Sequence, residues 1–337
     1  MTEVGVSRLS RIVNAVTKLH LPEESLRAMT KRAVGHDFSS FSCEELAGGL
    51  CNAVYLIETE DGKMVLKVAS PKDVVVMRHE RNYVSNEANM LKTFGEKLAI
   101  PAPRLICLDD TETLCPVPYF FMTFLDGTPL THVQPRPNER ELGEIKFRVG
   151  QICREISSLK AKAFGIPAMP ETYTESNFAF VYRLFEMLFQ DAADKNLFVP
   201  EAPGEEMLAL LKKCWPVLDE VTQPVYIHTD TWDGNLMIEN GKLSGLIDYA
   251  AVLYGDPLMN HDFHDFCPQP NASFCQGFGK ESFTQTEQIR LLVYRIWQRL
   301  GMIVERGFRH YEDPNTYAWV LDEYSKEVRA LRNALGA

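Results

Sequence analysis

The residues with the clearest chemical potential lie in the loop HTDTWDGN at 228–235 and in the strand that follows it. The loop has the pattern H-x-D-x-x-x-x-N, and the strand ends in Asp248. Phosphoryl transfer passes through a loose transition state, so a protein mainly positions groups and neutralises charge. It needs one carboxylate to accept the proton of the attacking hydroxyl and a second to hold Mg²⁺. Asp230, Asp248 and the neutral amide of Asn235 supply these parts in the expected order.

Each of these residues also has an ordinary structural interpretation. Asp230 alone would be a capping residue beside a turn, and His228 alone would be a histidine of the core. The joint pattern favours a functional site, because the order, the spacing and the turn at 240–241 before the strand all agree with it.

The loop resembles a known family when it is taken together with LSGLIDYA at 243–250 and YGDP at 254–257. The three segments are similar to those of aminoglycoside phosphotransferases and choline kinases. The resemblance implies an α+β, bilobal, protein-kinase-like fold with a small antiparallel sheet in the N-lobe and a mainly helical C-lobe.

The same resemblance implies a role for each polar residue of the loop and strand. It implies Asp230 as the catalytic base and His228 as a structural support of the loop. Asn235 and Asp248 are the implied ligands of Mg²⁺, which would accompany the nucleotide.

The sequence departs from the family pattern at two places. Trp232 replaces the His-Pro or similar pair that often follows the catalytic aspartate, and fructosamine kinases have a comparable tryptophan. Relatives carry a second aspartate in a D-L-A setting soon after G-D-P, whereas this chain has Asn-His-Asp-Phe at 260–263. We therefore expect Asp262 to keep a structural role in changed surroundings.

A lysine in the N-terminal half is suited to the α- and β-phosphates of a nucleotide. Lys67 lies in the expected strand 64–68, after a hairpin turn at 61–62. In kinase sites such a lysine pairs with a glutamate of the next helix. Glu80 and Glu87 are both candidates, and Glu87 is preferred because it begins an E-A-x-x-L run that resembles the family's. Without this context, all three side chains would simply face solvent.

A glycine-rich run precedes the first expected strand. Gly48, Gly49 and Asn52 form the pattern G-G-x-x-N, which resembles the family's phosphate-covering loop. Glycine there allows backbone N–H groups to approach phosphate closely. Two adjacent glycines are also typical of a plain turn. No Walker A sequence is present, so a P-loop fold is not supported.

The run YFFMTFLDG at 119–127 resembles the strand and hinge that bind the edge of adenine. The resemblance implies a hydrogen bond to the Thr123 carbonyl, one from the Leu125 N–H, and Met122 in the pocket wall. The alternative is a buried strand without a ligand.

Acidic residues of the C-terminal part are candidates for contact with a cationic acceptor. These are Asp262, Asp265 and Glu305, and each of them is also an ordinary solvated acidic position. His261 and His264 lack a third ligand at a suitable spacing, so we do not expect them to bind a metal.

Periodicity and turn signals predict the elements that position these residues. Helices are expected at 4–19, from Pro22 onward, and at 78–94, 139–163, 176–196, 205–221, 288–307 and 317–335. Strands are expected at 54–59, 64–68, 104–108, 119–125 and 243–247, together with a β region at 225–238. A chain of 337 residues exceeds the usual size of one core. We expect N-terminal helices at 1–36, a nucleotide-binding N-lobe at 37–126 and a catalytic and substrate-binding helical C-lobe at 127–337, with the hinge at 123–127.

Composition narrows the class of protein. The formal net charge of −11 disfavours a nucleic-acid partner and would suit a cationic substrate, although many cytoplasmic enzymes are acidic merely for solubility. The eight cysteines form no C-x-x-C pair, so neither a zinc ribbon nor a dithiol redox motif is indicated. No secretory signal and no apolar stretch of membrane-spanning length is present. These features predict a cytoplasmic protein without a membrane partner. The sequence does not distinguish a monomer from a homodimer.

The leading hypothesis is a small-molecule O-phosphotransferase that moves the γ-phosphoryl of ATP or GTP to a hydroxyl. The acceptor would be an aminoglycoside-like antibiotic or another polyhydroxyl or amino compound. One alternative is a metabolic kinase for a sugar, choline or amino alcohol, and another is a nucleotide-binding pseudo-kinase that regulates a partner. No A-P-E signature follows Asp248, which disfavours a protein kinase.

Overall fold

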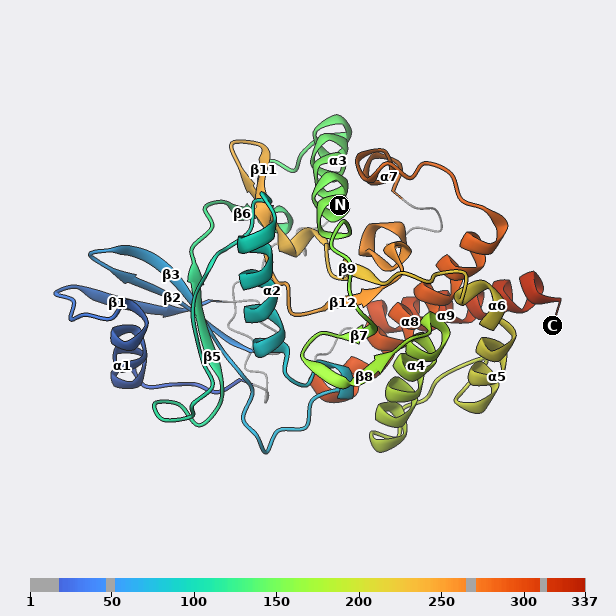
Figure 1. The fold of residues 1–337 in the computed structure, drawn as a ribbon, viewed down its shortest axis with the longest axis horizontal. Helices are drawn as coiled ribbons and strands as arrows, with labels where there is room; N and C mark the ends of the chain where they lie inside the picture. The colour runs from blue at the N-terminus through green and yellow to red at the C-terminus, as the bar shows by residue number, and fades with distance from the viewer. Residues whose placement is uncertain (1–17, 47–51, 265–270, 310–313, 337) are drawn as a thin grey trace.

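The computed structural model describes residues 18–46, 52–264, 271–309 and 314–336. Figure 1 shows two parts within this range, a sheet with two helices on the left and a larger helical part on the right. The helix expected at 4–19 lies almost entirely outside the described residues. The boundaries expected at 36 and 126 stay a prediction.

The N-terminal part is a five-stranded antiparallel sheet in the order β1-β2-β3-β5-β4. Its strands are β1 (Phe41–Glu45), β2 (Ala53–Thr59), β3 (Gly62–Val68), β4 (Leu105–Asp109) and β5 (Tyr119–Thr123). Alternate side chains of β2 are buried, as period 2 requires when the two faces of a strand differ.

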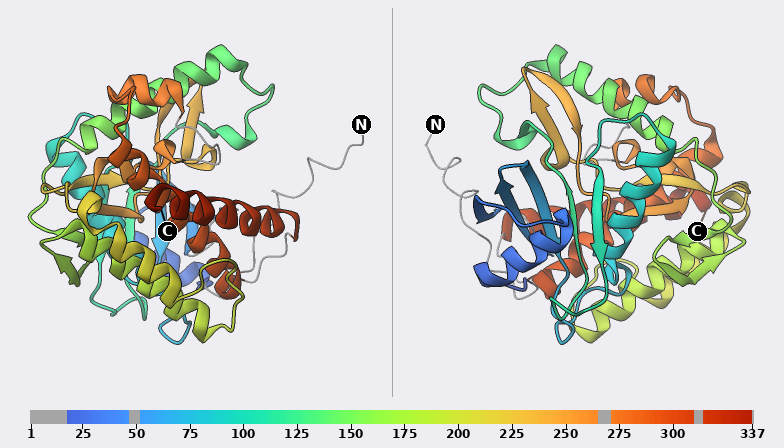
Figure 2. Two further views of the ribbon diagram at one scale, coloured as in Figure 1. Left: turned by 90° about the vertical axis from the view of Figure 1, so that its right-hand side faces the viewer. Right: turned by 60° about the vertical axis from the view of Figure 1, so that its left-hand side comes forward.

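Two helices cover the opposite faces of this sheet, as Figure 2 shows. Leu26 and Met29 of α1 (Glu23–Val34) pack in one apolar cluster with Tyr55 and Phe121. The helix α2 (Tyr83–Lys97) belongs to the other cluster, which includes Phe120 and continues into the C-terminal part. Because neighbouring residues of a strand point to opposite faces, β5 contributes to both clusters.

The C-terminal part consists mainly of helices with two small sheets between them. The helices are α3 (Glu139–Ile156), α4 (Asn177–Asp194), α5 (Glu205–Lys213), α6 (Trp215–Leu218), α7 (Ala272–Phe278), α8 (Gln285–Arg309) and α9 (Pro314–Leu335). One sheet has the order β11-β10-β6, with β11 (Lys242–Leu246), β10 (Leu236–Glu239) and β6 (Thr128–Pro129). The other has the order β8-β7-β12-β9, with β8 (Met169–Thr174), β7 (Phe164–Ile166), β12 (Val252–Gly255) and β9 (Val225–His228). The observed architecture is therefore the predicted α+β, kinase-like one.

The helix α3 is firmly placed within the helical part. Its N-terminus has a capping box, in which Asn138 and Glu141 satisfy each other's backbone N–H groups. At its crossing with α7 the backbones touch, because a Cβ at Gly150 would lie 2.2 Å from the Phe274 carbonyl oxygen. A Cβ at Gly277 would lie 1.9 Å from a backbone oxygen of α3. Only glycine allows this approach, and it holds α3 closely against α7.

The helix α2 is attached to the C-terminal part by one buried amide. Nδ2 of Asn86 donates to the carbonyls of Ala250 and Val252, at 2.8 and 3.1 Å. Oδ1 of Asn86 accepts from the Ala168 N–H at 3.1 Å. These bonds fix the helix that carries Glu87 against the segment that carries Asp248.

Several predicted elements have different bounds in the structure. The helix expected at 78–94 is interrupted, because Asn82 has a left-handed φ of 66° between a short 3₁₀ turn at Arg78–Glu80 and α2. The helix expected at 139–163 ends at Ile156, and the one expected at 205–221 is divided into α5 and α6. The strands β1, β6, β7, β8 and β12 were not predicted, and the β region expected at 225–238 is divided by the loop into β9 and β10. None of the described helices is long and apolar enough to cross a membrane.

Candidate active site

The loop at 228–235 connects β9 to β10 and ends in a 3₁₀ turn, Asp233–Asn235. Nδ2 of Asn235 donates to the main-chain carbonyl of Asp230 and to its carboxylate oxygen Oδ2, both at 2.9 Å. Asn235 therefore orients the carboxylate of Asp230. Since the amide nitrogen is used in this way, the amide oxygen Oδ1 is the atom suited to a metal ion.

His228 is fully buried behind the loop. Its Nδ1 accepts the backbone N–H of Asp230 at 3.3 Å, and its ring lies 4.8 Å from the ring of Tyr249. Burial lowers the pKa of His228 to about 4, so the imidazole is neutral at physiological pH. An uncharged ring that accepts at Nδ1 must carry its proton on Nε2. This geometry agrees with the expected supporting role, which remains a proposal.

Asp248 follows β11 and has a left-handed φ of 65°. A non-glycine residue in this conformation is strained, and such strain is concentrated at functional sites. The N–H of the preceding Ile247 donates to the Asn235 carbonyl at 3.1 Å, which keeps the end of the strand beside the loop. The side chain of Asp248 is 41 % exposed, so its carboxylate remains accessible to a ligand.

The environments of Asp230 and Asp248 separate their proton affinities. Burial and then the charge of Asp248 raise the pKa of Asp230 to about 6. Burial also acts to raise the pKa of Asp248, but Lys67 outweighs it and the pKa lies below its ordinary value. Asp248 is therefore ionised at neutral pH, whereas Asp230 can exchange a proton near neutral pH. Two carboxylates with divergent pKa values are typical of a site that divides acid–base work from charge stabilisation.

Lys67 and Glu87 form a buried ion pair between β3 and α2. Nζ of Lys67 lies 2.9 and 2.7 Å from the two carboxylate oxygens of Glu87, and 3.4 Å from Oδ1 of Asp248. Burial acts to lower the pKa of Lys67, but Asp248 and Glu87 raise it above its ordinary value, so the lysine is charged. The Tyr249 N–H also donates to Glu87 at 3.2 Å. The predicted pair is therefore present, and Glu80 instead contacts Arg309.

The donor set at Asn235 and Asp248 fits Mg²⁺. Magnesium prefers oxygen ligands and usually takes one or two protein carboxylates together with phosphate oxygens and water. One ionised carboxylate and one amide oxygen meet this preference and leave most positions of the metal for nucleotide and water. Among the described residues, no group of three or more His, Cys, Asp or Glu side chains is arranged to hold a metal ion by itself.

The residues expected around the nucleotide lie beside Lys67 in the sheet. Lys67 pairs with Phe120 of β5, and Met122, which is buried, lies two residues further along that strand. The Thr123 N–H donates to the Arg104 carbonyl at 2.9 Å. Thr123 and Leu125 are partly buried, and the hydrogen bonds expected from them to adenine stay a prediction.

The phosphate-covering loop is only partly described. Asn52 lies immediately before β2 and is partly buried. Gly48 and Gly49 lie outside the described residues, so the loop expected to cover the phosphates stays a prediction.

The acidic residues expected at the acceptor are differently placed. Asp262 is fully buried, and its carboxylate contacts Lys146 and the Thr231 hydroxyl, so its position favours the structural role over contact with an acceptor. Glu305 forms an ion pair with Arg309 at 2.7 Å. Asp265 lies outside the described residues.

Sequence reasoning missed the buried polar residues that support the loop from behind. Oδ1 of Asn260 accepts the His228 N–H at 3.2 Å, and Lys146 lies 2.9 Å from Asp262. Asn260 occurs within the unusual Asn-His-Asp-Phe segment, and this departure from the family pattern could have indicated a polar residue with a structural role. A lysine on the apolar face of a predicted helix was a second signal, because a buried charge requires a partner.

Comparisons with known proteins identify the family and the fold of this chain. The model of the phosphotransferase enzyme family matches residues 42–300. A solved structure of a presumed aminoglycoside phosphotransferase from Ralstonia eutropha is 12 % identical, with a TM-score of 0.66 over 94 % of this chain and 99 % of that one. A presumed fructosamine-3-kinase from Haemophilus somnus is 14 % identical, with a TM-score of 0.66 over 92 % and 97 %. A search of curated proteins found none that matches this chain.

A third solved structure is a ternary complex of the phosphotransferase APH(2″)-IIa with streptomycin and ATP. It is 13 % identical, with a TM-score of 0.58 over 91 % of this chain and 97 % of that one. At these identities the solved structures establish only the kinase-like fold. The match to the family model establishes that the chain belongs to the family. The chain is therefore a phosphotransferase enzyme and belongs to the phosphotransferase enzyme family.

Proposed function

We propose that this enzyme transfers the γ-phosphoryl group of ATP to a hydroxyl of a small acceptor, with Mg²⁺ bound by Asn235 and Asp248. The observation that carries the proposal is that two pairs of residues lie next to each other, Asp230 with Asn235 and Lys67 with Asp248. Asn235 orients the carboxylate of Asp230, and Lys67 lies 3.4 Å from the neighbouring Asp248. The first arrangement suits the attacking hydroxyl, and the second suits the phosphates.

The reaction requires little covalent chemistry from the protein. The acceptor oxygen forms a bond to the γ-phosphorus, the bond from that phosphorus to the β–γ bridging oxygen breaks, and ADP leaves. Asp230 accepts the hydroxyl proton, and its raised pKa keeps it close to the pH at which a base works efficiently. Lys67 holds the α- and β-phosphates, and Glu87 holds Lys67. A bound Mg²⁺ would neutralise charge on the phosphates.

Two acceptor classes remain within this proposal. An aminoglycoside-like acceptor is supported by the net charge of −11 and by the resemblance to antibiotic kinases. Among the metabolic alternatives of a sugar, choline or an amino alcohol, an uncharged acceptor such as a sugar is supported by a specific observation. Glu305 already forms an ion pair with Arg309, and Asp262 already contacts Lys146, so neither carboxylate awaits a cation.

A screen for ADP release tests the function. Purified enzyme with Mg·ATP or Mg·GTP is offered aminoglycosides, macrolides, sugars and amino alcohols in turn, and Asp230→Asn is the matched control. The proposal expects acceptor-dependent ADP release by the natural protein, with a phosphorylated product visible by mass spectrometry. Binding of nucleotide without transfer to any acceptor in a broad panel would instead favour the regulatory pseudo-kinase.

A further inference from the structure

Lys146 is a charged residue on the apolar face of α3. Its side chain is only 5 % exposed and lies among buried residues such as Ile145 and Val149. The ammonium Nζ lies 2.9 Å from Oδ1 of Asp262 and 3.3 Å from Oδ1 of Asp233. A buried lysine is costly unless it is paired, so this position requires an explanation.

Both carboxylates connect Lys146 to the catalytic loop. Asp233 belongs to the loop itself and begins the 3₁₀ turn that ends at Asn235. Asp262 reaches the loop through its second oxygen, Oδ2, which accepts the Thr231 hydroxyl at 2.5 Å. Thr231 is fully buried and directly follows Asp230. Lys146 therefore holds the loop at two points, one on each side of Trp232.

We propose that Lys146 is a positioning residue, which keeps loop 230–235 in the conformation that aims Asp230 at the acceptor hydroxyl. The proposal rests on the phosphotransferase function given above and adds a residue of α3 to it. The loop is irregular backbone, so its shape depends on side-chain bonds rather than on a ladder of strand pairs. Lys146 supplies a fixed charge to which Asp233 is bound directly and Thr231 through Asp262.

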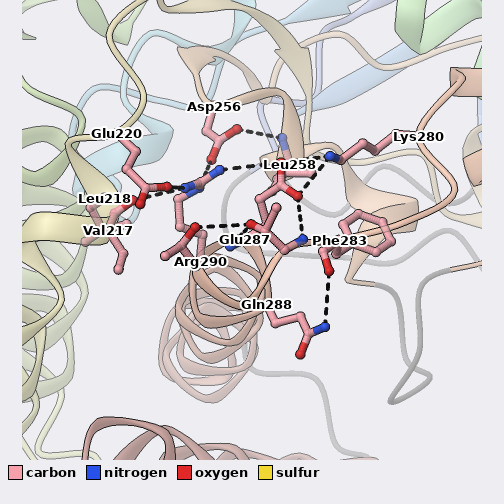
Figure 3. A network of polar contacts seen from close by, with 12 residues as sticks. Val217, Leu218, Glu220, Asp256, Leu258, Lys280, Phe283, Glu287, Gln288 and Arg290 are labelled. Atoms are coloured by element: carbon pink, nitrogen blue, oxygen red, sulfur yellow. Dashed lines mark hydrogen bonds and ion pairs between the residues drawn. The ribbon is translucent and has the colours of Figure 1, made fainter.

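The competing interpretation is that Lys146 merely stabilises the fold, and the chain contains a control for it. Arg290 of α8 is similarly buried, since its side chain is 7 % exposed, and it contacts the carboxylates of Glu220, Asp256 and Glu287. Figure 3 shows Arg290 between Asp256 and Glu220, at 2.9 and 2.7 Å. None of these contacts involves loop 228–235. Arg290→Met therefore removes a comparable buried cation without touching the catalytic loop.

The first experiment is hydrogen exchange measured by mass spectrometry on the whole enzyme. Lys146→Met is expected to raise exchange at the amides of 228–236 by at least about tenfold, while the sheet of the N-terminal part stays protected. Arg290→Met is expected to raise exchange near 256 and 290 and to leave 228–236 unchanged. Loss of protection at 228–236 in both variants, or in neither, would overturn the proposal. This readout needs no acceptor, so it decides the inference even if phosphotransfer itself fails.

The second experiment separates kcat from KM with an acceptor identified by the ADP-release screen. Each variant is assayed well below its own melting temperature. Lys146→Met should lower kcat by about 10²-fold, the usual effect of a misplacement of about 1 Å, and leave the KM for ATP within about twofold. Lys146→Arg, which keeps the charge, should recover at least part of kcat. Arg290→Met should keep kcat, and an equal loss in both variants would assign Lys146 a structural role only.

A milder substitution covers the case in which Lys146→Met does not fold. Thr231→Val keeps the contacts of Lys146 with both aspartates and removes only the hydroxyl that joins Asp262 to the loop. It should raise exchange at 228–236 and lower kcat in the same direction as Lys146→Met. Wild-type exchange and wild-type kcat in Thr231→Val would refute positioning through Asp262, whatever the outcome of the acceptor screen.

Discussion

The ion pair between Lys67 and Glu87 offers a test that separates stability from nucleotide binding. Glu87 is fully buried and Lys67 nearly so, and the pair is joined by bonds of 2.9 and 2.7 Å. Removal of one partner from a buried pair typically costs about 3–5 kcal/mol, because the other charge is left uncompensated. Lys67→Met should therefore lower the melting temperature by roughly 6–20 °C, at about 2–4 °C per kcal/mol for proteins above 150 residues.

A second substitution relieves the charge that Lys67→Met leaves behind. Glu87→Gln removes the negative charge but keeps an oxygen for the Tyr249 N–H, which Glu87 accepts at 3.2 Å. In the double variant Lys67→Met/Glu87→Gln neither position of the pair carries a buried charge. The double-mutant cycle should therefore give a coupling energy of about 1.5–3 kcal/mol, with the double variant more stable than Lys67→Met alone.

Nucleotide binding should not follow stability in this series. Isothermal titration with Mg·ATP should show weak binding in Lys67→Met and equally weak binding in the double variant, because neither can contact the phosphates at position 67. A coupling energy near zero would refute the structural reasoning. Recovery of ATP affinity in the double variant would refute the assignment of Lys67 to the phosphates.

Three further predictions concern the base, the pH dependence of stability and helix packing. Asp230→Asn should lower kcat by about 10²–10⁴-fold without weakening Mg·ATP binding, and an unchanged kcat on the true acceptor would remove Asp230 from the role of base. Burial raises the pKa of Glu327 to about 7, so the folded state binds a proton that the unfolded chain releases near pH 4.5. The free energy of unfolding should therefore fall between about pH 4.5 and 7 by about 1.4 kcal/mol per pH unit from this group, and urea titrations should show a shallower fall in Glu327→Gln. Gly277→Ala should destabilise the fold by at least about 1–3 kcal/mol, because its Cβ would lie 1.9 Å from a backbone oxygen; a melting temperature equal to the wild type would contradict this close crossing.

Local signals predicted which residues of the loop and the following strand lie together. The order of Asp230, Asn235 and Asp248 along the chain follows from a loop and the strand after it, so short-range spacing was sufficient to place them together. The pairing of Lys67 with Glu87 followed from the strand-then-helix order and the resemblance at Glu87. Their roles in catalysis and binding stay proposals.

The remaining features depend on contacts between distant segments. Asn82 interrupts a helix that periodicity alone would continue, because its φ of 66° turns the chain before α2. The strands β7 and β12 are short and pair with each other, while β7 also pairs with β8 and β12 with β9. No local sequence pattern predicts these pairings. Lys146 and Asp262 are far apart in the sequence, and only the packing of α3 in the folded protein brings them into contact.

Calorimetric titration of ATP in the presence and absence of Mg²⁺ tests the central claim most directly, because it requires no knowledge of the acceptor. The wild-type enzyme should bind ATP tightly only when Mg²⁺ is present, and Asp248→Ala should lose this dependence together with most of the affinity. Equal affinity with and without Mg²⁺, or an unchanged Mg·ATP affinity in Asp248→Ala, would contradict a phosphoryl-transfer site built on Asp230, Asn235 and Asp248.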